Sequence, residues 1–167
     1  MNNMTKMPLG LEQIIGAEPG PTVVLLKKTH GNETGGEKVL DLVIENLEDI
    51  SKGKLIYGVG NPEAALKNVR FIDIDLNRAC GKKTPEGYEG LRATELKPIL
   101  EGANYLIDVH SYLKPGQPII CYPGSDFETL EQLTKHMPIS TVIYGKGLWP
   151  LDGDHIYLDT LVCAEGG

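Results

Sequence analysis

The chain has 167 residues, of which 41% are hydrophobic and 23% are charged, and its formal net charge is −7. This composition is typical of a globular domain and excludes a disordered or fibrous chain. The acidic balance argues against nucleic acid and anionic membrane as partners, because both repel a negative surface. The three cysteines are widely spaced without a C-x-x-C pair. We therefore expect reduced thiols and a cytoplasmic protein, with neither a disulfide framework nor a cysteine zinc site.

Hydrophobic runs give neither a signal peptide near Met1 nor a membrane span, which needs roughly 18 apolar residues. Shorter runs and helical periodicities predict the elements of the first part of the chain. In chain order these are a buried strand over 22–28, a polar glycine-rich loop over 29–36, a helix over 37–50, a strand over 54–58 and a helical turn over 63–67.

The next segment, 69–76, alternates apolar and acidic residues, which predicts a half-buried strand that delivers Asn77 and Arg78 to its end. A mobile loop over 79–90 is expected to follow, and Pro98 is expected to kink or shorten the next helix. The remaining predictions are a helix over 91–101, strands over 104–110 and 119–122, a helix over 127–136, and strands over 141–144 and 156–164. Strands that alternate with helices indicate one α/β domain with a largely parallel sheet.

Candidate metal ligands follow two of the predicted strands, where open α/β sheets bind their ligands. His30 and Glu33 lie in the glycine-rich loop, and His110 ends an apolar strand in which Asp108 shares its face. Two imidazoles and one carboxylate leave a fourth zinc position open, as in catalytic zinc sites, and Asp108 could orient the imidazole of His110. The alternative is structural: His30 caps a loop and His110 is a hydrogen-bonded core histidine. The other two histidines, His136 and His155, are interpreted as surface residues.

A second group of polar residues follows the 69–76 segment. Arg78 and Asn77 form a plausible clamp for a substrate carboxylate, because the arginine fork matches a carboxylate in two hydrogen bonds. Arg70 could stabilise an oxyanion or hold a second carboxyl group. The alternative is that both arginines pair with Asp73 and Asp75 on an acidic surface.

Three motifs, HGNE at 30–33, RFIDIDLNR at 70–78 and DVHS at 108–111, together resemble the succinylglutamate desuccinylase/aspartoacylase family of the zinc carboxypeptidase clan. The resemblance covers about residues 22–111. It implies a three-layer α/β/α sandwich around a mixed, largely parallel sheet. It also implies one Zn²⁺ per chain, held by His30, Glu33 and His110.

The same resemblance implies that Arg70 polarises the scissile carbonyl and that Asn77 and Arg78 grip the substrate carboxylate. The implied general base is a glutamate near a glycine, late in the catalytic domain. Glu165 is the candidate here, although it lies closer to His110 than the family pattern implies. Two possibilities stay open: Glu165 is the base, or the catalytic domain formed by residues 1–167 stops short of it.

The favoured function is therefore a zinc-dependent hydrolase that cleaves the amide bond of small anionic N-acyl amino acids. A metallocarboxypeptidase acting on short peptides presents the same amide beside a free carboxylate, so the clamp does not separate the two. The sequence is also compatible with a zinc-binding domain that lacks a catalytic base and with a non-enzymatic α/β binding module. The acyl group, the amino acid and a homo-oligomeric state are left open.

Overall fold

The structure is a computed structural model that describes residues 7–80, 86–111, 118–122 and 126–144. Its main sheet has four strands: β1 (Leu11–Ile15), β2 (Glu18–Lys27), β3 (Lys52–Val59) and β4 (Tyr105–Val109). The strand order is β1-β3-β2-β4. β2 pairs in parallel with both β3 and β4, whereas β1 runs antiparallel to β3. The predicted mixed and largely parallel sheet is confirmed, with β1 as a strand that the sequence patterns did not predict.

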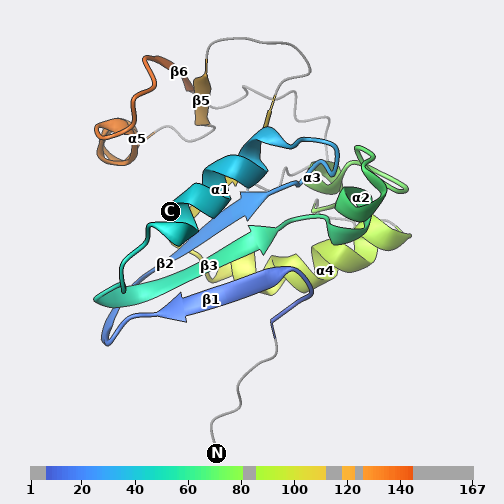
Figure 1. Ribbon diagram of the computed structural model, residues 1–167, viewed down its shortest axis with the longest axis horizontal. Coiled ribbons are helices and arrows are strands. Elements are labelled where there is room, and N and C mark those ends of the chain that lie inside the picture. The colour runs from blue at the N-terminus through green and yellow to red at the C-terminus, as the bar shows by residue number, and fades with distance from the viewer. Residues whose placement is uncertain (1–6, 81–85, 112–117, 123–125, 145–167) are drawn as a thin grey trace, which may run out of the picture.

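Helices cover both faces of this sheet, which gives the expected α/β/α layers (Figure 1). Because side chains alternate along a strand, Val24 and Leu26 of β2 point to one face, where they share a buried core with Leu96 and Leu100 of α4 (Tyr88–Glu101). On the opposite face α1 (Gly35–Glu45) packs along β2 and buries Leu40. The parallel strands β2 and β4 end at the same edge of the sheet, where the candidate ligands follow.

Two predicted helices differ from the structure at their ends. α1 stops at Glu45, earlier than the predicted 37–50, because Asn46 caps it and returns its side-chain amide to the carbonyl of Leu42 at 2.8 Å. α4 begins at Tyr88, inside the predicted loop over 79–90, and continues through Pro98 to Glu101. The early start of α4 places Glu89 in its first turn, where the side chain is buried.

The predicted strand over 69–76 is wrong. Residues 68–75 form turns and bends between two short helices, α2 (Pro62–Lys67) and α3 (Leu76–Ala79). The alternation of apolar and acidic residues is real, but the backbone N–H groups of residues 72–74 bind a glutamate carboxylate instead of a neighbouring strand. Asn77 and Arg78 therefore lie on a helical turn and not at the end of a strand.

The last described elements are the parallel strand pair β5 (Ile119–Tyr122) and β6 (Thr141–Tyr144), with α5 (Phe127–Thr134) between them in the chain. All three were predicted, and α5 ends slightly before the predicted boundary at 136. The strand predicted over 156–164 lies outside the described residues. Among the helices that the structure describes, none is both long and apolar enough to cross a membrane.

Candidate metal centre

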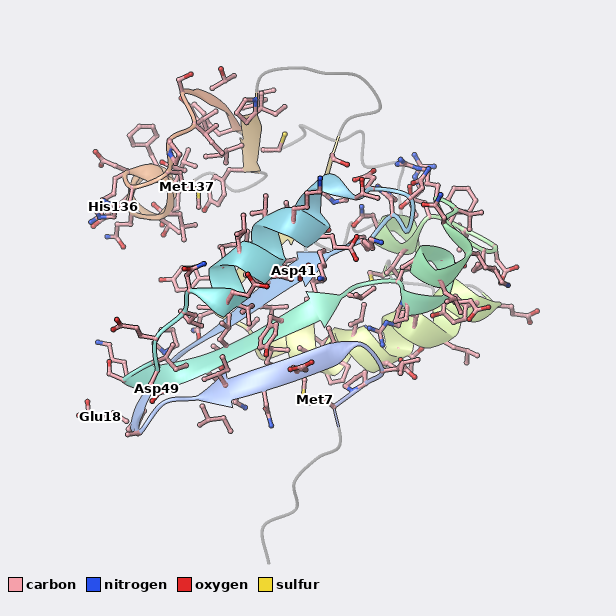
Figure 2. All side chains as sticks on the ribbon, in the orientation of Figure 1. Met7, Glu18, Asp41, Asp49, His136 and Met137 are labelled. Atoms are coloured by element: carbon pink, nitrogen blue, oxygen red, sulfur yellow. The ribbon has the colours of Figure 1, made fainter. Side chains whose placement is uncertain are left out.

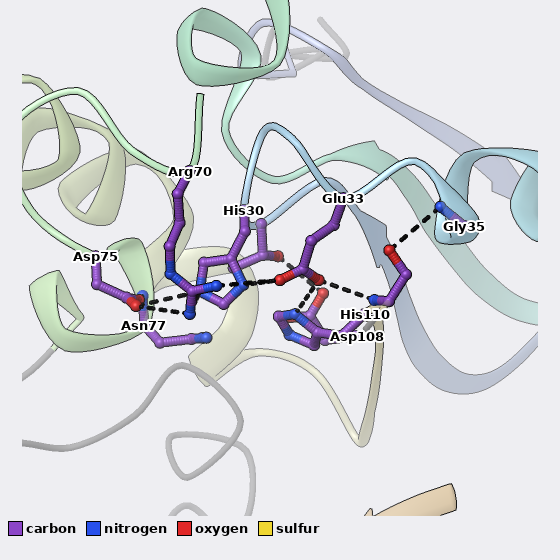
Figure 3. A network of polar contacts seen from close by, with 10 residues as sticks. His30, Glu33, Gly35, Arg70, Asp75, Asn77, Asp108 and His110 are labelled. Carbon is purple, nitrogen blue, oxygen red and sulfur yellow. Dashed lines mark hydrogen bonds and ion pairs between the residues drawn. The ribbon is translucent and has the colours of Figure 1, made fainter. Parts of the chain in front are cut away.

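The two candidate histidines meet because the strands that precede them are neighbours. Lys27 at the end of β2 is paired with Val109 at the end of β4, so the chain leaves both strands at the same edge. His30 and His110 follow at once, and their ring centroids lie 4.8 Å apart. Two residues separated by about half the chain thereby share one site (Figure 3).

Gly31 fixes the loop that carries His30 and Glu33. A Cβ atom at this position would lie only 2.1 Å from the carbonyl carbon of Ala64 and 2.3 Å from its oxygen, so the loop rests directly on the backbone of α2. The Gly31 N–H also donates to the carbonyl of Arg70 at 3.2 Å. Only glycine permits such a close approach of two backbones.

Glu33 lies between the two imidazoles. Its Oε1 is 2.7 Å from His30 Nδ1, and its Oε2 is 3.0 Å from His110 Nδ1. Oε2 also accepts a hydrogen bond of 2.9 Å from the backbone N–H of Ser111. Burial tends to raise the pKa of the Glu33 carboxyl, but the hydrogen bonds from His110, His30 and Ser111 outweigh it and hold the pKa far below its ordinary range.

The outer nitrogen of each imidazole faces an aspartate. His110 Nε2 is 2.9 Å from Asp108 Oδ2, which is the contact predicted from the strand alternation. His30 Nε2 is 3.2 Å from Asp75 Oδ2. Asp108 is itself held by the hydroxyl of the buried Thr29, which donates to Oδ1 at 2.8 Å.

These carboxylates make the site favourable for positive charge. Burial lowers the pKa of His110, but the charge of Asp108 and the hydrogen bonds to Asp108 and Glu33 raise it to about 10. The pKa of His30 is likewise raised, because hydrogen bonds to Asp75 and Glu33 outweigh its burial. The protonated form of both imidazoles is therefore favoured, and each Nδ1–H faces the carboxylate of Glu33.

The donor set fits a divalent metal ion in place of those protons. One ligand atom each from His30, Glu33 and His110 lie within 4.8 Å of one another. With Nε2–H donated to Asp75 and Asp108, each Nδ1 would direct a lone pair toward Glu33, which is the tautomer a metal requires. Imidazole and carboxylate ligands suit Zn²⁺, and three protein ligands leave room for a fourth.

Arg70 lies beside the ligands. Its Nη1 is 3.3 Å from Glu33 Oε1, and its Nη2 is 3.4 Å from Asp75 Oδ2. Nη2 also lies 3.0 Å from His30 Nε2. A guanidinium only donates hydrogen bonds, so His30 Nε2 would have to accept from Arg70 and could not at the same time donate to Asp75. We assign the Nε2 hydrogen to the Asp75 contact. The Arg70 side chain is 49% exposed, and within the described part of the chain its guanidinium contacts only Glu33, His30 and Asp75.

Asn77 and Arg78 lie on α3, in the turn after its N-terminal cap, Asp75. The Asn77 N–H donates to Asp75 Oδ1 at 3.1 Å, so Asp75 caps α3 while its other oxygen faces His30 and Arg70. Arg78 is exposed and makes no ion pair with any residue that the structure describes. Surface pairing with an aspartate therefore describes Arg70, which contacts Asp75, but does not describe Arg78.

Three further candidates from the sequence are His136, His155 and Glu165. His136 follows α5 and is exposed, as expected for a surface residue (Figure 2). His155 and the candidate base Glu165 lie outside the described residues. Two contributors to the site were missed from the sequence: Asp75 as the partner of His30, and Thr29 behind Asp108. Both depend on contacts between residues far apart in the sequence, so no local motif indicates them.

Comparison with known proteins identifies the family of the chain. The family model described as succinylglutamate desuccinylase/aspartoacylase catalytic domain matches residues 19–112. The chain is 35% identical over 88 residues to a succinylglutamate desuccinylase of Pseudomonas fluorescens, an alignment that covers 48% of this chain and 25% of that enzyme. It is 38% identical over 79 residues to the aspartoacylase of Danio rerio, covering 46% of this chain and 23% of that protein.

A solved structure of a succinylglutamate desuccinylase from Silicibacter sp. TM1040 superposes with a TM-score of 0.73 at 22% identity. The superposition covers 93% of this chain and 50% of that one, which shows the shared fold. The aligned segments span about a quarter of the length of the two curated relatives. Fold and site define an α/β domain with a candidate His-Glu-His metal site where its parallel strands end. The chain belongs to the succinylglutamate desuccinylase/aspartoacylase family.

Proposed function

We propose that the protein is a zinc-dependent amidohydrolase that cleaves N-acyl amino acids into a carboxylic acid and a free amino acid. One observation carries the proposal: Arg70 contacts the carboxylate of Glu33, so a half-exposed guanidinium lies directly beside the three candidate ligands. The names of the relatives, a desuccinylase and an aspartoacylase, favour N-acyl amino acids over peptides as the substrate class.

Zn²⁺ held by His30, Glu33 and His110 would supply a Lewis acid and lower the pKa of a water molecule in its open position to about 7. Asp75 and Asp108 hold the two imidazoles in the tautomer that leaves Nδ1 free, since each accepts a hydrogen bond from Nε2. These two carboxylates therefore orient the imidazoles and do not act on the substrate.

Arg70 would donate N–H groups to the amide oxygen as negative charge develops there during attack by water. Its contacts with Glu33 and Asp75 fix the guanidinium before the substrate arrives, so little reorganisation is needed. Asn77 and Arg78 would bind the carboxylate of the amino-acid part and place the amide carbon in line with the water. A base must take a proton from the water as it attacks the amide carbon and give it to the amine nitrogen as the C–N bond breaks; we assign this role to Glu165.

The test is amine release by the zinc-loaded protein. N-acetyl and N-succinyl amino acids are supplied separately, and short peptides with free C-termini serve as the rival substrates. His110→Ala should abolish both zinc binding and turnover, whereas His136→Ala, a matched exposed histidine, should leave both unchanged. Glu165→Gln should bind zinc normally and lose turnover.

The outcomes separate the competing functions. Cleavage of peptides without cleavage of N-acyl amino acids would make the protein a carboxypeptidase. Stoichiometric zinc binding that depends on His110, without release of amine from any substrate, would make it a metal-binding domain without its own base. Failure to bind zinc would refute both the proposed metal centre and the proposed amidohydrolase function.

A further inference from the structure

A buried glutamate outside the metal centre organises the segment that carries Arg70, Asp75 and Arg78. Glu89, in the first turn of α4, has no exposed surface. Its carboxylate accepts hydrogen bonds from the backbone N–H groups of Ile72 at 2.7 Å, Asp73 at 2.9 Å and Ile74 at 3.3 Å.

Asn61 supplies the fourth hydrogen bond to this carboxylate, from Nδ2 to Glu89 Oε1 at 3.0 Å. The same Asn61 caps α2 with its side-chain oxygen. Its backbone N–H donates to the carbonyl of Lys28, next to the loop over 29–34 that carries His30 and Glu33, which we call the metal loop. Burial raises the pKa of Glu89, but these hydrogen bonds outweigh burial and lower the pKa below its ordinary value. Glu89 is thus an ionised carboxylate that joins α4, α2 and the 72–74 segment.

The contact between α4 and this segment is reciprocal. Asp73 Oδ2 accepts a hydrogen bond of 2.7 Å from the backbone N–H of Tyr88, and the residue before it, Gly87, provides no side-chain cap for α4. Gly87 has a φ of +97°, and a Cβ atom there would lie 2.6 Å from Asp73 Oδ2. The segment therefore caps the helix with Asp73, while the helix holds the segment with Glu89.

Apart from Glu89, side chains and not backbone pairing hold the segment: Arg70 contacts Glu33, Asp75 contacts His30, and Ile74 packs against the core. The sheet does not hold it, because residues 68–75 pair with none of the described strands. Its backbone meets the metal loop at a single hydrogen bond, from Gly31 N–H to the Arg70 carbonyl. The three donors bound by Glu89 lie between Arg70 on one side and Asp75 on the other, so their position sets both side chains.

We propose that Glu89 is a positioning residue for substrate-carboxylate recognition, which acts by fixing the 70–78 segment beside the metal centre. The inference rests on the proposed amidohydrolase function and extends it to a residue that contacts neither the ligands nor the substrate. A purely structural role would instead affect the whole domain equally.

The variant Glu89→Gln tests this with a minimal change of size. Both carboxylate oxygens accept from N–H groups: Oε1 from Ile72 and Asn61, and Oε2 from Asp73 and Ile74. A glutamine must therefore place its NH₂ group against donors in either orientation, and the segment has to move away. Glu101→Gln is the control, because it removes the same charge from an exposed site on the same helix.

The readout is the ratio of kcat/KM for an N-acetyl amino acid to kcat/KM for its amide, which lacks the carboxylate. We expect this ratio to fall at least ~10-fold in Glu89→Gln and to stay unchanged in Glu101→Gln, because misplacement by about 1 Å is enough to cost ~100-fold in rate. Zinc should still bind at one ion per chain. An equal loss on both substrates, with the ratio unchanged, would overturn the proposal.

Asp73→Ala covers the case in which Glu89→Gln does not fold. Asp73 is exposed, so its removal leaves no buried charge, yet it cuts the reciprocal contact. We expect a smaller fall of the ratio in the same direction, and an unchanged ratio would refute the role of the contact.

Hydrogen exchange separates this proposal from the function on which it rests. The amides of residues 72–74 should exchange at least ~10-fold faster in Asp73→Ala and in any folded Glu89→Gln, with the amides of β2 and β3 unchanged. If the parent hydrolyses no substrate, the proposed function fails. The anchoring of the segment by Glu89 then stands if only these three amides exchange faster, and is refuted if they do not.

Discussion

Gly31→Ala is expected to damage folding and metal binding together. The added Cβ would lie 2.1 Å from the Ala64 carbonyl carbon and 2.3 Å from the nitrogen of Ala65, so backbone and not a flexible side chain would have to move. Overpacking of this kind costs about 3 kcal/mol. For a domain of this size that corresponds to a fall in Tm of about 6–12 °C.

The same shift would separate His30 from Glu33 and His110, because Gly31 connects the two ligands of the loop. Zinc at 100 times its Kd should stabilise the parent by about 2.7 kcal/mol. The variant should gain much less, with a zinc affinity reduced by ~10-fold or more. Thermal melts with and without zinc, and competition with a chromophoric chelator, measure both effects.

Gly102→Ala is the matched control. Gly102 ends α4 at a φ of −89°, and its added Cβ would meet the carbonyl oxygen of Pro98 at an ordinary 3.4 Å. This variant should melt and bind zinc like the parent. If Gly31→Ala behaves in the same way as Gly102→Ala, the close contact between the metal loop and α2 does not hold the ligands as described.

Three further predictions concern the outer contacts and the core. Asp108→Asn should lower zinc affinity by ~10–100-fold in chelator competition, whereas the exposed Asp41→Asn should not; equal affinities would contradict the orienting role of Asp108. Leu96→Ala should lower the free energy of unfolding by about 2–5 kcal/mol in urea titrations, and a loss below about 1 kcal/mol would contradict its place in the core. The pKa of Glu89 is lower in the folded than in the unfolded protein. Its ionisation therefore contributes to the free energy of unfolding above the unfolded pKa of about 4.3, and this contribution is lost as the pH falls through the folded pKa. Urea titrations from pH 6 to pH 3 should therefore show a smaller loss of stability in Glu89→Gln than in the parent; equal slopes would refute this.

The sequence by itself determined the elements whose side chains face the core. The apolar runs that became β2, β4, β5 and β6 were predicted because burial imposes a local pattern along each strand. His30, Glu33 and His110 were found in the same way, since each follows an element whose end could be predicted and the topology brings such ends to one edge of a parallel sheet.

Only the tertiary structure decided the segment around Arg70. Its alternating residues predicted a strand, but its backbone N–H groups are satisfied by Glu89, which lies 15–17 positions further along the chain. Asp75 likewise acquires its role from His30, 45 positions earlier. A local pattern records which side chains are buried, but it does not record which distant carboxylate receives a backbone donor, so these contacts appear only once the chain is folded.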